Sequence, residues 1–352
     1  MSPSPSSTPS AQAFDTQRLD AFLRQRLPDL AGAMQLQAIG GGQSNPTFFL
    51  SYGERHMVLR KKPAGEVLPS AHAVDREYRV LQALAGSALP VPPVVLYHAD
   101  AQLIGTPFYL MERVPGRVFD ANDLPGMAPA ERRAIYLAMA DTLATLHAVE
   151  WRAAGLADFG RQGAFFERQL SRWSRQWALS RTRPNPAIDA LLDWLPANIP
   201  PGDEVALTHG DFKLNNLLFH PSEPRVVAVL DWELSTLGHP LADFSYHCMS
   251  WHIPASLGRG IGGMDIAALG IPDEDSYIRR YCERTRITTP EALRADWNFY
   301  LAYNMFRIAA ILQGIAKRVE AGTASSAQAK ASGDTARPMA ELAWSFALKS
   351  GA

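Results

Sequence analysis

The residue types able to hold a metal ion and move a proton gather between residues 205 and 232. They follow two apolar segments, residues 205–207 and 226–230, which predict short strands. The side chains at the ends of these segments are His209, Asp211, Lys213, Asn216 and Asp231. Two short strands with polar residues at their ends suit a hairpin that presents carboxylates to a cleft.

The spacing of three of these residues indicates phosphoryl transfer. Asn216 follows Asp211 by five positions, and Asp231 follows it by twenty. Kinases use this order, with an Asp base, an Asn metal ligand on the same loop and an Asp metal ligand at a strand end. Mg²⁺ prefers hard oxygen ligands, and one carboxylate with one amide oxygen leaves room for phosphates and water. We therefore predict Asp211 as the catalytic base, and Asn216 and Asp231 as metal ligands.

The segment HGDFKLNNLLF followed by VLDWE resembles the aminoglycoside phosphotransferase family, whose motif is H-G-D-x-x-x-x-N and then a strand-terminal Asp. The likeness extends to GQSNPTFFL, MVLRKKPAG, AHAVDREYRVL and LDWELSTLGHPLADF, over roughly residues 30–345. It is strongest to the branch found fused to acyl-CoA dehydrogenases. The resemblance implies an α+β, bilobal protein-kinase-like fold with a small β-rich N-lobe and a larger helical C-lobe. It also implies ATP and Mg²⁺ as cofactors.

Residues near the motif receive roles from the same resemblance. Lys213, two positions after the base, matches a cation that many kinases aim at the transferring phosphate, where it would offset developing charge. His209 is interpreted as a brace for the loop. Asp243 in GHPLADF resembles a position that organises the loop or caps the next helix. His147, on a helix predicted over residues 129–149, is interpreted as a hydrogen-bonded core histidine rather than a catalyst.

A glycine-rich stretch over residues 39–50 is the predicted nucleotide loop. Its glycines permit close backbone approach, and Ser44 and Asn45 offer donors to phosphate oxygens. A plain hairpin turn is the alternative interpretation. The position of the stretch upstream of a strand predicted over residues 56–60 favours the nucleotide loop.

The strand over residues 56–60 ends on Arg60, where a kinase N-lobe carries its phosphate-binding Lys. Choline kinases are similar in placing Arg there. Lys61 and Lys62 follow directly, so the sequence leaves open which of the three cations meets the phosphates. A solvated basic strand end is the alternative.

Glu77, on a helix predicted over residues 70–85, is the expected partner of the strand cation by the kinase Lys–Glu pairing. A surface Glu paired with Arg76 or Arg79 is the alternative. Through this pairing, Glu77 is predicted as part of the nucleotide-binding site.

Composition divides the chain into a tail and two lobes. Residues 1–13 are rich in Ser and Pro and predict a disordered tail. We expect an N-lobe over residues 14–113 and a C-lobe over residues 114–352, which holds the catalytic loop, the metal ligands and the acceptor site. The hinge is placed at MERVPG, where backbone groups between Glu112 and Val114 would meet the adenine edge.

Charge and cysteine content restrict the class of protein. The 352 residues include 34 Lys plus Arg and 35 Asp plus Glu, for a formal charge of −1, so no general field attracts nucleic acid. The 2 cysteines form neither a CxxC pair nor a disulfide framework, which favours a cytoplasmic location. We expect no signal peptide, because no basic segment with an apolar core opens the sequence. We expect no membrane partner, because the apolar stretch at residues 299–315 is interrupted by polar residues. The oligomeric state is left open.

The expected partner is a small-molecule hydroxyl acceptor, and the branch resemblance implies a hydroxyacyl-CoA or related acid. Arginine suits CoA phosphates through bidentate hydrogen bonds. The candidate arginines are Arg168, Arg172, Arg175 and Arg259. The expected edges of the acceptor pocket are Trp251, His252 and residues 258–263.

Two other functions stay open. An aminoglycoside phosphotransferase would use the acids at residues 273–275 to bind a polycation. A catalytically silent nucleotide-binding protein is disfavoured because Asp211, Asn216 and Asp231 are all retained. The DFG at residues 158–160 precedes the catalytic loop, and the GxGxxG at residues 258–263 lacks a βαβ context, so both are read as chance matches.

Overall fold

The computed structural model describes residues 14–40, 45–64, 73–258, 260–323 and 329–352. The chain divides into two compact units. Unit 1 lies within Met1–Pro115 and Ala228–Glu233, and unit 2 within Gly116–Val227 and Leu234–Ala352. The dividing point after Pro115 lies two residues beyond the expected lobe boundary, and a later segment that carries Asp231 belongs to unit 1. The expected tail and Ser44 lie outside the described residues.

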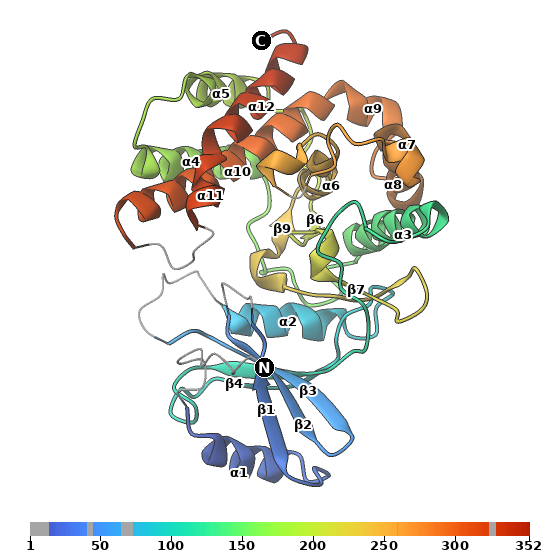
Figure 1. The fold of residues 1–352 in the computed structure, drawn as a ribbon, viewed down its shortest axis with the longest axis vertical. Helices are drawn as coiled ribbons and strands as arrows, with labels where there is room; N and C mark the ends of the chain where they lie inside the picture. The colour runs from blue at the N-terminus through green and yellow to red at the C-terminus, as the bar shows by residue number, and fades with distance from the viewer. Residues whose placement is uncertain (1–13, 41–44, 65–72, 259, 324–328) are drawn as a thin grey trace, which may run out of the picture. The chain divides into compact units, whose positions relative to one another are not determined.

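Unit 1 is built on an antiparallel five-stranded sheet with the order β1-β2-β3-β5-β4. Its strands are β1 (Met34–Ala38), β2 (Thr47–Tyr52), β3 (Arg55–Lys61), β4 (Val94–His98) and β5 (Phe108–Glu112). Helix α1 (Thr16–Arg26) lies at one end of the sheet, and α2 (Val74–Leu84) lies at the other end (Figure 1).

The core of unit 1 explains which way the β3 side chains point. Successive side chains of a strand face opposite sides of the sheet. Met57 and Leu59 are buried in the core cluster that includes Leu19 of α1. Lys61 shares their face of the strand, whereas Arg60 points to the other face. The sheet therefore separates two adjacent cations.

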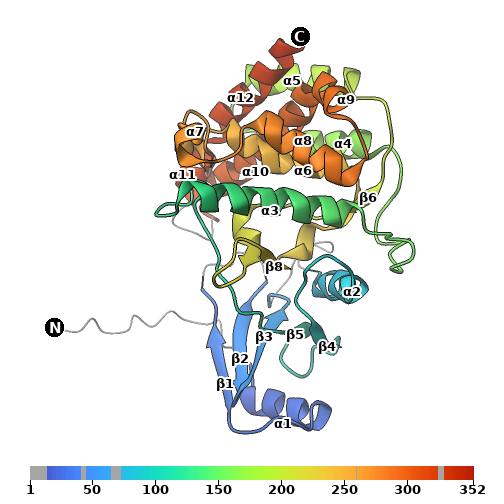
Figure 2. The ribbon, with the colours of Figure 1, turned by 90° about the vertical axis from the view of Figure 1, so that its right-hand side faces the viewer.

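Unit 2 is mostly helical. Its helices are α3 (Pro129–His147), α4 (Phe165–Ser180), α5 (Pro186–Ala197), α6 (Pro240–Cys248), α7 (Ile266–Leu269), α8 (Glu274–Thr285), α9 (Pro290–Ala295), α10 (Trp297–Glu320), α11 (Ala329–Asp334) and α12 (Ala336–Lys349). Helix α10 contacts α4, α5, α6, α11 and α12, and α3 packs along α8 (Figure 2). A long apolar helix in the middle of the unit thus holds α6 in place.

Short strands and 3₁₀ helices carry the loops. The strands are β6 (Ala206–Thr208), β7 (Leu217–Phe219), β8 (Val226–Val229) and β9 (Thr236–Gly238), and β6 pairs with β9 in antiparallel register. The 3₁₀ helices are η1 (Leu214–Asn216), η2 (Trp232–Leu234), η3 (Met249–Trp251) and η4 (Ala255–Leu257). The boundary between the two units falls within β8.

Among the described residues, no helix is both long enough and apolar enough to cross a lipid bilayer.

Helix α4 has one buried face. Its stripe of Phe166, Leu170, Trp173 and Trp177 is buried, as the spacing of these residues predicts. The exposed face of the same helix carries Arg172.

Candidate active site

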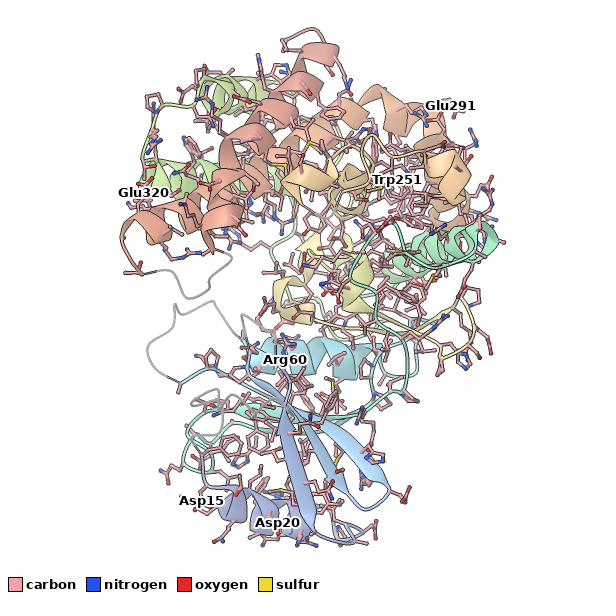
Figure 3. All side chains as sticks on the ribbon, viewed as in Figure 1. Asp15, Asp20, Arg60, Trp251, Glu291 and Glu320 are labelled. Carbon is pink, nitrogen blue, oxygen red and sulfur yellow. The ribbon has the colours of Figure 1, made fainter. Side chains whose placement is uncertain are left out.

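A buried ion pair organises the polar part of unit 1. Nε of Arg60 lies 2.9 Å from Oε2 of Glu77, and a terminal nitrogen of Arg60 donates to Oδ1 of Asp231 at 2.5 Å. Arg60 lies at the α2 end of the sheet, whereas Asp20 of α1 and Asp15, which caps that helix, lie at the opposite end (Figure 3). The Glu77 side chain is 1% exposed, so the surface-pair alternative is wrong.

Besides this ion pair, Glu77 accepts two hydrogen bonds. The Tyr109 hydroxyl donates to Oε2 at 3.1 Å, and the Asn45 amide donates to Oε1 at 2.5 Å. Burial raises the pKa of Glu77 to about 7, although the Arg60 guanidinium acts in the opposite direction. Two hydrogen bonds and the ion pair with Arg60 therefore hold the Glu77 carboxylate in place.

The structure separates the three candidate cations after β3. Lys61 is buried among the core of unit 1, where its Nζ donates to the Ile104 carbonyl at 3.3 Å and lies 4.8 Å from the Phe14 ring centroid. Burial lowers the pKa of Lys61. The backbone N–H of Lys62 donates to the Pro107 carbonyl. Of these three residues, Arg60 is the one whose side chain pairs with Glu77 and Asp231.

Asn45 has a partner that the sequence did not suggest. Its amide nitrogen is used by Glu77, and its Oδ1 is buried with no hydrogen-bond partner in the described structure. The side chain thus braces the carboxylate that holds Arg60. Ser44, the other predicted donor of the loop, lies outside the described residues.

Asp231 adopts a backbone conformation that few residues other than glycine tolerate. Its φ is 65°, and Asp is among the residues that accept the left-handed region most readily. The neighbouring Trp232 is buried and donates its indole N–H to the Val229 carbonyl at 3.0 Å. The turn therefore aims the Asp231 carboxylate toward Arg60 while Trp232 anchors the segment.

The predicted hinge follows β5. The N–H of Glu112 donates to the Pro93 carbonyl at 2.8 Å, and the N–H of Arg113 donates to the His56 carbonyl at 3.0 Å. The Glu112 side chain pairs with Arg55. Val114 lies directly beyond these sheet-like bonds.

In unit 2, the loop that carries Asp211 is held through its backbone. Asp243 of α6 is buried, and its two carboxylate oxygens accept the N–H groups of His209 at 2.7 Å and Gly210 at 2.8 Å. Gly210 has φ 81°, and a side chain there would meet the Leu234 carbonyl oxygen at 2.7 Å. The predicted loop-organising role of Asp243 is confirmed, but His239, not Asp243, caps α6.

Two histidines belong to the same bracing. His147 is buried and lies 3.2 Å from the Asp243 carboxylate through Nε2, and 2.6 Å from the Tyr281 hydroxyl through Nδ1. This confirms the interpretation as a hydrogen-bonded core histidine. His209 accepts the Asp211 N–H through Nδ1 at 3.2 Å and is fully buried. It contacts the backbone of the loop that carries Asp211.

Two side chains donate hydrogen bonds to the Asp211 carboxylate, and a third forms an ion pair with it. The Tyr246 hydroxyl lies 2.5 Å from Oδ1, while the Asn216 amide nitrogen at 3.0 Å and the Lys213 ammonium at 2.8 Å share Oδ2. The Asn216 amide also donates to the Asp211 carbonyl at 2.9 Å. Three of the residues predicted for the catalytic loop thus lie together.

A pocket of about 200 Å³ adjoins this loop. Its walls are largely apolar, and the described residues that line it include no Asp or Glu. The lining residues are Asn122, Phe212, Lys213, Leu214, Tyr246, His247, Met249, Ser250, Ile253, Leu257, Gly258, Gly260, Ile308, Leu312 and Met339. Lys213 and Tyr246 contact both the Asp211 carboxylate and this pocket.

Only some of the residues predicted to edge the acceptor pocket line the pocket beside the Asp211 loop. Gly258 and Gly260 line the pocket. Trp251 and His252 do not, because Trp251 donates its indole N–H to the Pro272 carbonyl and His252 lies 2.7 Å from Glu274. The 3₁₀ turn η3 directs these two side chains toward α8 instead.

The candidate arginines also lie elsewhere. Arg168 donates to the Arg161 carbonyl at 2.8 Å, and the Arg172 guanidinium lies 5.0 Å from the Trp173 ring centroid. Neither they nor Arg175 line the pocket, and Arg259 is outside the described residues.

Tyr246 and Arg307 are site residues that the sequence analysis missed. Arg307, on α10, donates to the Gly210 carbonyl at 2.8 Å, and its guanidinium lies 5.0 Å from the Tyr246 ring centroid. Tyr246 is 35 positions from Asp211, and Arg307 is 97 positions from Gly210. The only local signal was the interruption of an apolar helix by a charged residue.

The oxygen donors suit Mg²⁺. Because the Asn216 amide nitrogen faces Asp211, its Oδ1 is the atom left for a metal ion. Asp231 supplies a carboxylate that is 31% exposed. Amide and carboxylate oxygens are both hard donors of the kind that Mg²⁺ takes. The described residues contain no group of three or more His, Cys, Asp or Glu side chains of the kind that forms an all-protein metal site.

Comparison with known sequences identifies the relatives. The model of the phosphotransferase enzyme family matches residues 35–294. Acyl-CoA dehydrogenase family member 10 of Mus musculus is 47% identical over 322 residues, 91% of this chain and 30% of that protein. Family member 11 of Rattus norvegicus is 43% identical over 334 residues, 93% of this chain and 42% of that protein. The chain thus spans less than half the length of these relatives.

Solved structures give a consistent picture. A protein from Ralstonia eutropha JMP134, described provisionally as an aminoglycoside phosphotransferase, has a TM-score of 0.86 and 53% identity, with 96% of this chain and 99% of that chain covered. A thermostable mutant of the aminoglycoside phosphotransferase APH(4)-Ia, in a ternary complex with AMP-PNP and hygromycin B, has a TM-score of 0.60 and 17% sequence identity. The match covers 93% of this chain and 98% of that chain. Choline kinase from Cryptosporidium parvum has a TM-score of 0.65 and 13% sequence identity, with 96% of this chain and 95% of that chain covered. The last two likenesses confirm the α+β, protein-kinase-like fold.

Proposed function

Because this chain belongs to the phosphotransferase enzyme family, we propose that it transfers the γ-phosphoryl group of ATP, with Mg²⁺, to a hydroxyl group of a small molecule. The observation that supports this most directly is the Asp211 carboxylate. It is held by Lys213, Asn216 and Tyr246 beside a pocket. A fixed carboxylate next to a pocket is what a general base needs.

In the proposed reaction, the proton of the acceptor hydroxyl passes to Asp211. The acceptor oxygen forms a bond to the γ-phosphorus, and the bond from that phosphorus to the oxygen bridging the β-phosphate breaks, so ADP leaves. Lys213 stabilises the negative charge on the transferring group, because a fixed cation acts more strongly in a site that excludes water.

The nucleotide and metal roles go to the remaining residues. Asn216 and Asp231 would bind Mg²⁺, which offsets the charge of the phosphates. Arg60 would contact the phosphates, with Glu77 holding it and Asn45 holding Glu77. Since the N–H of Glu112 is used within the sheet, the backbone at Val114 is the proposed contact of the adenine edge.

For the acceptor we propose a hydroxyacyl-CoA or a related hydroxy acid. Acyl-CoA dehydrogenases act on acyl-CoA substrates, and the names of the relatives carry that activity, although this chain covers less than half of those proteins. The largely apolar pocket suits a carbon chain next to the reactive hydroxyl, and Lys213 is its one lining Lys or Arg among the described residues.

An aminoglycoside is the second candidate, because the protein at 53% identity carries that provisional description. A polycation needs carboxylates, yet the acids at 273–275 are engaged locally. Asp273 caps α8, Glu274 contacts His252 and Asp275 contacts Arg294. This observation favours the acyl substrate.

ADP release with Mg²⁺ and ATP tests the function. The acceptor panel holds hydroxyacyl-CoAs, free hydroxy acids and kanamycin-type aminoglycosides, with GTP as an alternative donor. Asp211→Asn should lower kcat by about 10²-fold or more, since a positioned base contributes roughly 10²–10⁴. Nucleotide affinity should stay unchanged. Asp193→Asn, an exposed carboxylate on α5, is the matched control and should retain activity.

Full activity of Asp211→Asn would remove the proposed base. Nucleotide binding without turnover of any acceptor would favour the catalytically silent protein. Turnover of kanamycin-type compounds and of no hydroxyacyl compound would decide for the aminoglycoside.

A further inference from the structure

The two oxygens of the Asp211 carboxylate have different surroundings. A carboxylate offers about four acceptor positions, two on each oxygen. Oδ2 accepts the Asn216 amide and pairs with the Lys213 ammonium, so both of these partners lie on Oδ2. Oδ1 accepts the Tyr246 hydroxyl and no other donor from the described residues. One acceptor position therefore remains on Oδ1.

Tyr246 is held firmly where it contacts Oδ1. It lies on α6 three residues after Asp243, and residues three apart on a helix share a face. Asp243 fixes the backbone of the catalytic loop, so a single helix determines both the loop and the carboxylate direction. Asn304 of α10 fastens this helix, because its amide donates to the Ala242 carbonyl at 3.0 Å and to the Ser245 hydroxyl at 2.9 Å.

Arg307 completes the setting of Tyr246. Its guanidinium lies 5.0 Å from the ring centroid while it donates to the Gly210 carbonyl. Burial raises the pKa of Tyr246 well above its usual range, so the phenol remains a hydrogen-bond donor. The ring is therefore fixed from one side by a cation and the hydroxyl from the other by the base.

We infer that Tyr246 is a positioning residue: its hydroxyl orients the Asp211 carboxylate so that the remaining position on Oδ1 faces the acceptor hydroxyl in the adjoining pocket. This inference rests on the proposed function, since it requires Asp211 to be the base. Tyr246 lines that pocket, as do Phe212 and Lys213, the two residues that follow Asp211. In this arrangement Oδ1 accepts the substrate proton, while Oδ2 stays bound to Lys213 and Asn216.

The test compares Tyr246→Phe with Tyr303→Phe. The first keeps the ring, and with it the packing against Arg307 and the pocket wall, but removes the hydroxyl. Tyr303, a buried tyrosine of α10, supplies the same chemical change without a bond to Asp211. Hydrogen bonds to charged groups contribute enough that Tyr246→Phe should lower kcat by about tenfold to a hundredfold. The acceptor KM and the nucleotide Kd should change by less than about twofold, as for the control.

A double-mutant cycle separates positioning from a general structural role. In an Asp211→Asn background, Tyr246→Phe should have little further effect on kcat, because the base it orients is gone. An equal loss of kcat in both backgrounds would overturn the inference. Loss of folded protein in Tyr246→Phe but not in Tyr303→Phe would assign the hydroxyl to stability and also overturn it.

The failure of the two proposals can be told apart. Wild-type kcat for Tyr246→Phe, together with an inactive Asp211→Asn, refutes the positioning role and leaves the base in place. Wild-type kcat for Asp211→Asn refutes the proposed function itself.

Discussion

Arg60 of β3 and Glu77 of α2 form a buried ion pair, with 2.9 Å between Nε and Oε2. The Arg60 side chain is 14% exposed and that of Glu77 1%. Breaking a buried pair leaves one charge without a partner and costs far more than breaking a surface pair. This pair therefore links the stability of unit 1 to the position of the proposed phosphate-binding cation.

Glu77→Ala should destabilise the protein by about 3–5 kcal/mol, the range for removing one partner of a buried ion pair. It should also weaken ATP binding, because Arg60 loses the group that orients it. Urea unfolding gives the first quantity and calorimetry the second. The control is Glu341→Ala, which breaks an exposed pair with Arg337 and should cost less than about 1 kcal/mol. Similar small losses in both variants would contradict the structural role of Glu77.

Asp231→Ala should abolish the Mg²⁺-dependent part of ATP affinity, since it removes a carboxylate ligand from the ion on the phosphates. Asp231→Asn should lose the same binding but tolerate the φ of 65° better than Ala. We therefore expect Asp231→Ala to be less stable than Asp231→Asn by about 1 kcal/mol. Titrations of ATP with Mg²⁺ and with a chelator measure the first effect. Unchanged binding of Mg²⁺-ATP would remove Asp231 from the metal site.

Asp243→Ala should lower both stability and kcat while Asp211 remains in place. The change leaves the N–H groups of His209 and Gly210 without their acceptor. Each buried unsatisfied donor costs about 1–3 kcal/mol. Asp243→Asn keeps one carbonyl oxygen as an acceptor, so its losses of stability and of kcat should be smaller than those of Asp243→Ala. Denaturant unfolding and steady-state kinetics check the order of the two variants, and a fully stable Asp243→Ala would show that the loop does not depend on this carboxylate.

His247 should make the protein less stable in mild acid. Burial lowers its pKa from 6.5 to about 4, and Nε2 lies 2.8 Å from the Tyr277 hydroxyl. Between these two pKa values the unfolded chain binds a proton that the folded chain does not. The contribution is therefore complete above pH 6.5 and is lost as the pH falls toward 4, by up to about 3 kcal/mol.

His247→Gln tests this assignment, because glutamine offers an acceptor to Tyr277 without titrating in this range. Its free energy of unfolding should fall less than that of the wild type between pH 7 and pH 5. An identical pH dependence in both proteins would place the acid sensitivity on other groups, such as Asp243, whose pKa is lowered in the folded state by hydrogen bonds and by His147.

The sequence alone was enough to predict phosphoryl transfer as the reaction type. The spacing of Asp211, Asn216 and Asp231 is a local property, and it is informative because a catalytic loop and the strand after it are contiguous in the chain. The buried stripe of α4 was also predictable, since helical periodicity is set by near neighbours.

Only the tertiary structure decided whether the side chain of Arg60 or that of Lys61 pairs with Glu77. Their side chains alternate across β3, and the choice depended on which face of the sheet packs against α2 and which against α1. No local pattern specifies that, because both faces of the strand are covered. The same reason applies to Asn45. The sequence predicted it as a donor to phosphate oxygens, whereas in the structure its amide donates to Glu77, 32 positions away.

Tertiary structure also decided the surroundings of Asp211. Tyr246 and Arg307 reach the loop that carries Asp211 from α6 and α10, across 35 and 97 positions. The pocket draws its lining from segments between Asn122 and Met339. Contacts of such sequence separation are created by the packing of α10 against α6, and the spacing of residues along the chain does not encode them.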